Sequence, residues 1–226
     1  MWAEQPVVKI RCDGTLEREL RARGFRYVAG VDEVGRGALF GPVVAAAVIL
    51  DPRRRIVGLK DSKQLLPDER ESLARLIRAR ALCWAVSWAE CHEIDALNIL
   101  QATHLAMRRA VLGLAVCPRS ILVDGDQLPQ FSDIAPHCLS TRAIIKGDCS
   151  EPAISAASIL AKTVRDALMR SLDVVYPGYG LAVHKGYGTA DHLAALERHA
   201  PCAIHRRSFR PVGAPWGPGS VESDDS

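Results

Sequence analysis

The sequence has no C-x-x-C pair, no long apolar run and few aromatic residues. Its seven cysteines are an odd number without zinc-finger spacing, which argues against that class of metal site and favours reduced thiols. No window approaches the roughly 18 to 20 apolar residues of a membrane span, and the opening MWAEQPVVKIRCDG lacks a signal peptide's apolar core. We therefore expect a cytoplasmic protein without membrane contact.

The composition is that of an ordinary globular protein. Of 226 residues, 48% are hydrophobic and 24% are charged, which allows a core of the protein's own in one large domain or one domain with an appendage. The formal net charge of +3 permits an anionic partner without requiring one. Composition alone leaves the function open.

The first half of the chain alternates apolar runs with turn residues. DGTLERELRARG predicts a helix that Asp13 or Thr15 can cap and Gly24 can end. FRYVAGVD, GPVVAAAVIL and LCWAVSWAE predict three strands, the second buried on both faces because it is almost continuously apolar. Three strands in succession favour an antiparallel meander.

Helices and strands alternate after residue 92. EIDALNILQATHLAMRRAVLGLA and EPAISAASILAKTVRDALMRSLD predict two long helices, with SILVD and TRAIIKGD as short strands between them. A short helix is expected over Ala190 to His199, and the tail GAPWGPGSVESDDS is expected to be disordered. The predicted fold class is therefore α/β, a mixed sheet with helices packed on it.

Acidic residues follow three predicted strands: Asp32 and Glu33 after the first, Asp124 after SILV and Asp148 after AIIKG. Neighbouring strands lie about 4.8 Å apart, so these carboxylates would form a cluster that needs a cation. Carboxylate oxygens without nearby His or Cys suit Mg²⁺ or Mn²⁺, and pairs of such ions serve in phosphodiester cleavage. Because successive strand residues face opposite sides, we expect the first strand to break at Glu33.

Three other motifs could contact a nucleic acid. In GRG, Gly35 and Gly37 allow the backbone to approach a phosphate or sugar while Arg36 supplies charge, although the motif is also an ordinary turn. Lys63 in LKDSKQL lies on a predicted loop or helix start, and Tyr187 in HKGYGTADH could stack on a sugar or base. The arginines of HRRSF could bind phosphates or lie in solvent.

Seven segments occur in the order found in one enzyme family: YVAGVDEVGRG with GPVVAAAVIL, LKDSKQL, VDGDQLP, IIKGD, ISAASILAKTVRD, HKGYGT and HRRSF. From about residue 26 to 211 the chain resembles bacterial ribonuclease HII. The resemblance implies an RNase H-like fold, a five-stranded mixed sheet flanked by helices with a C-terminal helical extension. It divides the chain into a leader and helix (1–25), a catalytic domain (26–175), a substrate-binding extension (176–213) and the tail (214–226).

The resemblance also implies an activity. Members of this family are metal-dependent endonucleases that cut RNA in RNA–DNA hybrids. They also incise 5′ to single ribonucleotides embedded in duplex DNA, leaving a 3′-hydroxyl and a 5′-phosphate. We expect a monomer that uses Mg²⁺ or Mn²⁺ in a two-metal mechanism. The acids that match the family's metal ligands are Asp32, Glu33, Asp124 and Asp148.

The substrate-binding residues are carried over in the same way. Gly35, Arg36 and Gly37 match the loop that senses the ribonucleotide 2′-OH, the group by which RNA differs from DNA. Tyr187 matches a residue that packs on the adjacent deoxyribose, and Lys63 matches a phosphate contact. The remaining alternatives are another RNase H-like nuclease, such as ribonuclease HIII or a junction resolvase, and a non-catalytic hybrid-binding module.

Four residues depart from the family pattern or compete with it. Ala38 and Phe40 stand where proline and a small residue are common, which could change the shape of the loop that faces the ribonucleotide. Asp126 adds an acid two positions after Asp124, and we expect it to face solvent. Asp166 could also join the cluster, but we expect it to form a salt bridge with Arg165 or with a helix neighbour.

Overall fold

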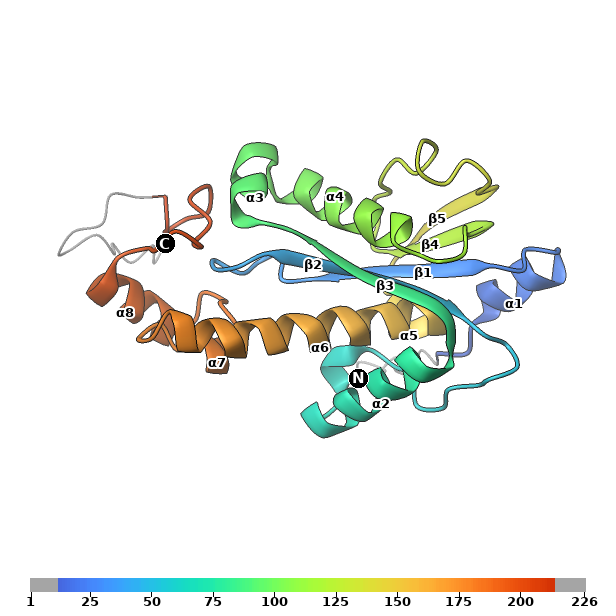
Figure 1. Ribbon diagram of the computed structural model, residues 1–226, viewed down its shortest axis with the longest axis horizontal. Helices are drawn as coiled ribbons and strands as arrows, with labels where there is room; N and C mark the ends of the chain where they lie inside the picture. Colours follow the sequence, from blue (N-terminus) through green and yellow to red (C-terminus); the bar gives the residue numbers. More distant parts are fainter. Residues whose placement is uncertain (1–11, 214–226) are drawn as a thin grey trace, which may run out of the picture.

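The computed structural model describes residues 12–213, in which a mixed five-stranded sheet has the strand order β3-β2-β1-β4-β5 (Figure 1). The strands are β1 (Val28–Val34), β2 (Val43–Leu50), β3 (Ala81–Ala89), β4 (Ser120–Asp124) and β5 (Ser140–Ile144). The first three are antiparallel neighbours, whereas β4 is parallel to β1 and β5 to β4. The predicted meander and mixed sheet are confirmed, and the predicted disordered tail lies outside the described residues.

Helices cover both faces of the sheet (Figure 1). They are α1 (Thr15–Ala22), the 3₁₀ turn η1 (Ser62–Gln64), α2 (Pro67–Arg80), α3 (Cys91–Leu97), α4 (Ile99–Leu112), α5 (Gly147–Ser150), α6 (Pro152–Val175), α7 (Leu181–His184) and α8 (Ala190–His199). The four helices predicted from sequence are present, although the second divides into α3 and α4 at Asn98, whose φ is 69°. Helix α2 was not predicted, because charged residues interrupt its apolar stripe.

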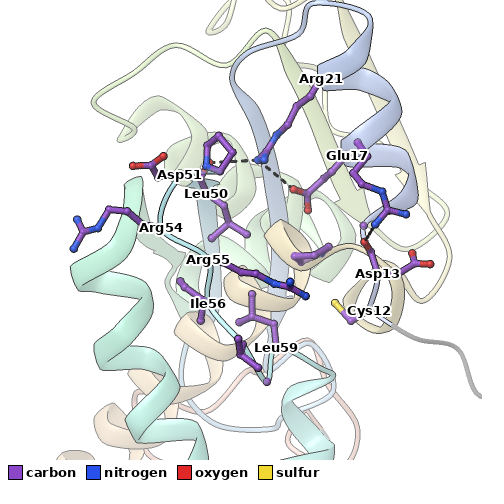
Figure 2. A pocket seen from close by; sticks show the side chains of 16 residues that line it. Cys12, Asp13, Glu17, Arg21, Leu50, Asp51, Arg54, Arg55, Ile56 and Leu59 are labelled. Carbon is purple, nitrogen blue, oxygen red and sulfur yellow. Dashed lines mark hydrogen bonds and ion pairs between the residues drawn. The ribbon is translucent and has the colours of Figure 1, made fainter.

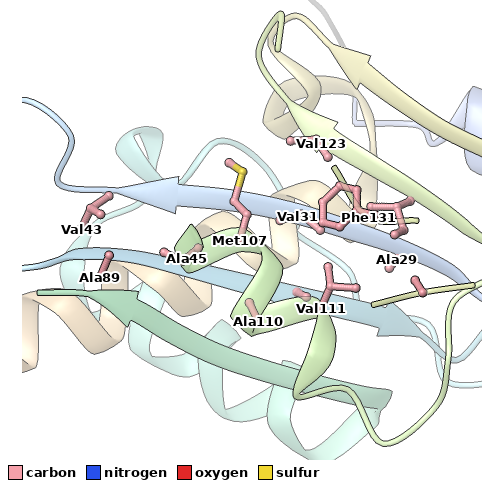
Figure 3. Close-up of a cluster of buried hydrophobic side chains, with 14 of the residues drawn as sticks. Ala29, Val31, Val43, Ala45, Ala89, Met107, Ala110, Val111, Val123 and Phe131 are labelled. Carbon is pink, nitrogen blue, oxygen red and sulfur yellow. The ribbon is translucent and has the colours of Figure 1, made fainter. Parts of the chain in front are cut away.

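The sheet separates two apolar cores, which explains the continuous apolar sequence of β2. Its alternate residues Ala45 and Ala47 face α4, where Met107 and Val111 complete one core (Figure 3). The intervening residues of β2 face α6 and α2 in the second core. Small side chains let α6 lie close to the sheet. At Gly30 an added Cβ would come within 2.1 Å of the Ala153 carbonyl carbon.

A third core joins the end of α6 to the C-terminal segment. Phe40 is fully buried there, and its ring contacts Tyr176, Tyr179 and His205. The Phe40 side chain therefore belongs to this core and anchors the loop that carries it. No helix among the described residues is long and apolar enough to cross a membrane.

Candidate active site

Six of the residues singled out from the sequence line one cavity of about 320 Å³: Asp32, Glu33, Lys63, Asp124, Asp148 and Tyr187. The cavity lies where β4 has ended and the edge of β1 is open. The pairing of β1 with β4 ends at Val31 and Val123, so the last three residues of β1 have no strand on that side. The cavity therefore forms where the pairing between β1 and β4 stops.

The first two acids reach this cavity from a regular strand. Asp32 and Glu33 pair in register with Ala46 and Ala45, which belong to opposite faces of the sheet. The expected break at Glu33 was wrong, because β1 continues to Val34. Since no strand covers the edge here, Glu33 on the α4 side still lines the cavity that Asp32 enters from the α6 side.

The other two acids approach from the next strand and from a short helix. Asp124 is the last residue of β4. Asp148 does not end a strand as predicted. Strand β5 stops at Ile144, the backbone turns through Lys146 with φ 57°, and Asp148 lies in α5. The two residues are nevertheless adjacent, because the Asp148 amide donates to Asp124 Oδ1 at 3.3 Å.

Burial and mutual repulsion make this cluster electrostatically unfavourable as bare carboxylates. Burial raises the pKa of Asp32 well above its usual range, and the charges of Glu33 and Asp124 raise it further. Burial likewise raises the pKa values of Glu33, Asp124 and Asp148. Among the described residues, the one ion pair to these four acids joins Arg36 Nη1 to Glu33 Oε1 at 3.4 Å.

The donor set fits a hard divalent cation. Four carboxylates share one cavity, and oxygen ligands of this type are those that Mg²⁺ and Mn²⁺ prefer. A related group lies beside it, since ligand atoms of Asp61, Asp148 and Cys149 are within 4.8 Å of one another. Asp61 already accepts the Lys63 amide at 2.9 Å, which caps η1 and orients the LKDSKQL segment at the cavity.

The GRG loop begins immediately after β1. Gly35 has φ 91°, and a Cβ there would meet Arg165 Nε at 2.2 Å, so both conformation and space require glycine. Gly37 is exposed, and no atom would lie within 4 Å of a Cβ added there, so that part of the loop is accessible. Arg36 lines a small neighbouring pocket together with Glu33 and Asp124, so the loop adjoins the acids.

The backbone of Tyr187 lies beside the loop that follows β1. It pairs with Ala38 in an isolated antiparallel bridge, and its ring lies 5.5 Å from the Arg165 guanidinium carbon. Two hydroxyl groups in the same cavity, those of Ser62 and Ser158, are 2.9 Å apart; Ser62 lies on the LKDSKQL segment that the sequence indicated, whereas sequence reasoning missed Ser158. Both lie within segments that were recognised, but neither motif distinguishes a cavity serine from a buried one.

Neither of the two competing acids lines the cavity of the four acids, although Asp126 lines the small neighbouring pocket together with Glu33 and Asp124. Asp126 is exposed, as expected. Asp166 pairs with its helix neighbour Lys162 at 2.7 Å and with Arg70 at 3.5 Å, which confirms the expected salt bridge to a helix neighbour. Arg165 instead turns toward the loop after β1.

A more voluminous cavity, of about 490 Å³, lies beside α1 and the end of β2 (Figure 2). Its lining includes Glu17, Arg21 and Leu50 but none of the residues predicted to act in catalysis or substrate binding. The Arg21 guanidinium donates to Glu17 Oε2 at 3.4 Å and to the Leu50 carbonyl at 3.3 Å. Its charged groups are therefore partly paired with one another.

Comparisons with known proteins identify a family and a shared fold. A family model described as Ribonuclease HII matches residues 29–212. The chain is 60% identical over 187 residues to a ribonuclease HII of Azoarcus sp. (strain BH72), covering 83% of this chain and 89% of that protein. It is 55% identical over 206 residues to one of Solibacter usitatus, covering 91% and 87%. The crystal structure of ribonuclease H2 from Pyrococcus horikoshii OT3 is similar with a TM-score of 0.68 and 29% identity, covering 83% of this chain and 95% of that one.

Proposed function

Because the chain belongs to the ribonuclease HII family and is thus a metal-dependent type 2 ribonuclease H acting on RNA–DNA substrates, we propose that it incises duplex DNA 5′ to single embedded ribonucleotides. The observation that carries this proposal is that the candidate metal ligands lie next to the candidate residues for ribose recognition. A cluster of buried and half-buried carboxylates lines the same cavity as Tyr187, and the GRG loop follows directly from the strand that bears two of those acids.

The four acids are proposed to hold the metal. Asp32, Glu33, Asp124 and Asp148 would bind it through oxygen, and a bound cation would relieve the mutual repulsion that raises the pKa values of Asp32 and Asp148. Bound divalent ions would lower the pKa of an attacking water and neutralise the departing 3′-oxygen. The chain itself need supply no nucleophile.

The recognition residues are proposed to read the sugar beside the scissile phosphate. The backbone of Gly35, Arg36 and Gly37 can approach the 2′-OH closely, which tests for both a donor and an acceptor. Tyr187 would pack on the next deoxyribose and Lys63 would contact a phosphate. Arg36 lines the small pocket, and Lys63 and Tyr187 line the adjoining cavity of the acids. This placement supports the proposal that these residues contact one and the same nucleic-acid strand.

We further propose that the enzyme acts as a monomer in the cytoplasm. All seven cysteines are free, which suits a reducing compartment. Size-exclusion chromatography with light scattering tests the monomer, and a mass near twice 24.6 kDa would contradict it.

The decisive experiment uses a DNA duplex that contains one ribonucleotide. With Mg²⁺ or Mn²⁺ we expect one nick on its 5′ side, with a 3′-hydroxyl and a 5′-phosphate, and no cut in the all-deoxy duplex. A protein that cuts only longer RNA runs would instead act like ribonuclease HIII. Binding without any metal-dependent product would indicate a hybrid-binding module.

The fourth ligand is tested by two matched substitutions. Asp148→Asn should abolish cleavage while the protein still folds. Asp166→Asn should remain active, because Asp166 is paired with Lys162 and Arg70 outside the cluster. Full activity of Asp148→Asn together with loss in Asp166→Asn would reverse the assignment.

A further inference from the structure

Two arginines lie fully buried behind the GRG loop. Arg165 of α6 and Arg206 of the HRRSF segment are both 0% exposed. Among the described residues, no carboxylate oxygen lies within ion-pair distance of either guanidinium. Arg206 was expected from sequence to bind phosphate or lie in solvent, and the structure contradicts both alternatives.

Their hydrogen bonds go to backbone carbonyls instead. Arg206 donates from Nε to the Gly41 carbonyl at 2.9 Å and from Nη1 to the Arg36 carbonyl at 2.8 Å. Its third nitrogen, Nη2, is buried without a partner. Arg206 thus bridges the two ends of the segment that contains the recognition loop, residues 36–41.

Arg165 makes the complementary set of contacts. It donates to the carbonyls of Phe40 at 3.0 Å, Pro42 at 3.2 Å and Lys185 at 2.8 Å. Lys185 lies two residues before Tyr187, and the Arg165 guanidinium also faces the ring of Tyr187. One guanidinium therefore ties the loop after β1 to the segment that presents Tyr187.

Such groups are costly to bury. Burial lowers the pKa of Arg206 to about 10 and also lowers that of Arg165. Carbonyl dipoles compensate a buried cation less completely than a carboxylate does. A planar guanidinium can, however, hold several carbonyls in a fixed relative position, which a lysine ammonium cannot do equally well.

We propose that Arg165 and Arg206 are positioning residues for ribonucleotide specificity, which fix the GRG loop relative to Tyr187 so that the 2′-OH is read in one geometry. This inference rests on the proposed roles of the loop and of Tyr187. Neither arginine touches the substrate. Their contribution is to discrimination between ribose and deoxyribose rather than to bond cleavage.

The test measures discrimination with active enzyme. The substrate is a duplex with one ribonucleotide, and the competitor is the same duplex in all-deoxy form, so that KM, kcat and the competitor's Ki come from one assay. The variant Arg206→Lys keeps the positive charge but loses the planar guanidinium that bonds two carbonyls at once. We expect its ratio of Ki to KM to fall about tenfold, which is the effect of roughly one hydrogen bond to a charged group. The Ki itself should change less than about twofold.

Amide hydrogen exchange gives a second readout. The Leu39 and Gly41 amides bond to the carbonyls of Gly186 at 2.8 Å and Ile204 at 3.0 Å, and both should exchange faster in Arg206→Lys. The matched control is Arg108→Lys, which alters a forked pair with Asp133 on the surface. It should leave the ratio and both amides unchanged.

The outcomes separate the two proposals. If the wild type does not incise the ribonucleotide duplex, the proposed function fails. If it does, an unchanged ratio in a folded Arg206→Lys, with only kcat or the melting temperature lowered, assigns a purely structural role and overturns this inference. Should Arg206→Lys not fold, Arg165→Lys takes its place with the same expected loss of discrimination. Failure of both to fold also overturns the inference.

Discussion

Glu17 and Glu151 are as deeply buried as Asp32, yet their carboxylates accept hydrogen bonds from backbone amides at the starts of two helices instead of lining a common cavity with other acids. Glu151 accepts the amides of Leu16 and Glu17 at the start of α1, at 3.3 and 3.0 Å. Glu17 in turn accepts the Ala153 amide at the start of α6 at 2.6 Å. This glutamate pair, Glu17 and Glu151, caps two helices reciprocally and joins them.

The acidic cluster of Asp32, Glu33, Asp124 and Asp148 has the opposite arrangement. Among the described residues, its members accept amide hydrogen bonds only from neighbours within the site, such as the Asp148 amide on Asp124, and they raise one another's pKa. Two buried carboxylates that each cap the start of a helix are structural elements, whereas four that face a common cavity form an incomplete site. Asp32 is as buried as the glutamate pair and the other three acids are half-buried, so the difference in role lies in the partners.

The largest effect is expected from Asp32→Asn. Cleavage of the ribonucleotide duplex should fall more than about 100-fold, since residues that only support metal ligands already cost up to that factor. In EDTA the variant should unfold at a higher denaturant concentration than the wild type, because like-charge repulsion is relieved. Initial rates and urea titrations measure both, and a lower unfolding midpoint would contradict the electrostatic account.

The titration of Glu17 should instead make the free energy of unfolding depend on pH. Burial raises its pKa from 4.5 to about 7 in the folded protein. The folded state then binds its proton more tightly than the unfolded state, so stability falls as pH rises from about 4.5 to about 7. The full difference corresponds to roughly 3 kcal/mol.

The variant Glu17→Gln tests this by comparison with the wild type. The difference in free energy of unfolding between them should shift in favour of Glu17→Gln as pH rises through that window and stay constant above it. Urea titrations at several pH values measure it. Glu19→Gln, an exposed position on the same helix, is the control. A pH-independent difference would show that the Glu17 carboxylate stays ionised.

Manganese binding should separate the two groups of acids directly. At a concentration 100 times its dissociation constant, Mn²⁺ should stabilise the wild type by about 2.7 kcal/mol if it binds only the folded state. Glu17→Gln should gain the same increment, and Asp32→Asn should lose most of it. Thermal unfolding with and without Mn²⁺ measures the increments. Equal stabilisation of all three proteins would place the metal elsewhere.

The elements and site residues that could be predicted from sequence are those with a clear local pattern or motif. Strands β1, β2 and β4 are readable because buried apolar runs end in turns, and Asp32 and Asp124 follow from those strand ends. Asp148 was placed on a strand end by pattern but lies in α5. Its identification came from the family motif, since a turn through Lys146 at positive φ has no strong residue signal.

Long-range partners set the limit of that reasoning. Nothing local distinguishes Arg206, which is fully buried, from the neighbouring exposed Arg207. Glu151 looked like an ordinary residue at a helix start, whereas its side chain caps a helix 134 positions earlier in the chain. Which partner a charged side chain meets depends on the assembled fold, so structural and functional charges look alike in sequence.

The smallest effect should come from Asp126→Asn, two residues beyond the metal-binding candidate Asp124. Asp126 is exposed, so water screens its charge and the substitution should change kcat/KM less than about twofold. Any gain should appear at low salt, where one negative charge fewer favours the approach of DNA. Asp124→Asn, measured alongside, should lose activity as Asp32→Asn does. A comparable loss in Asp126→Asn would show that exposure does not separate structural acids from metal ligands here, and that the small pocket shared by Asp126, Glu33 and Asp124 takes part in metal binding.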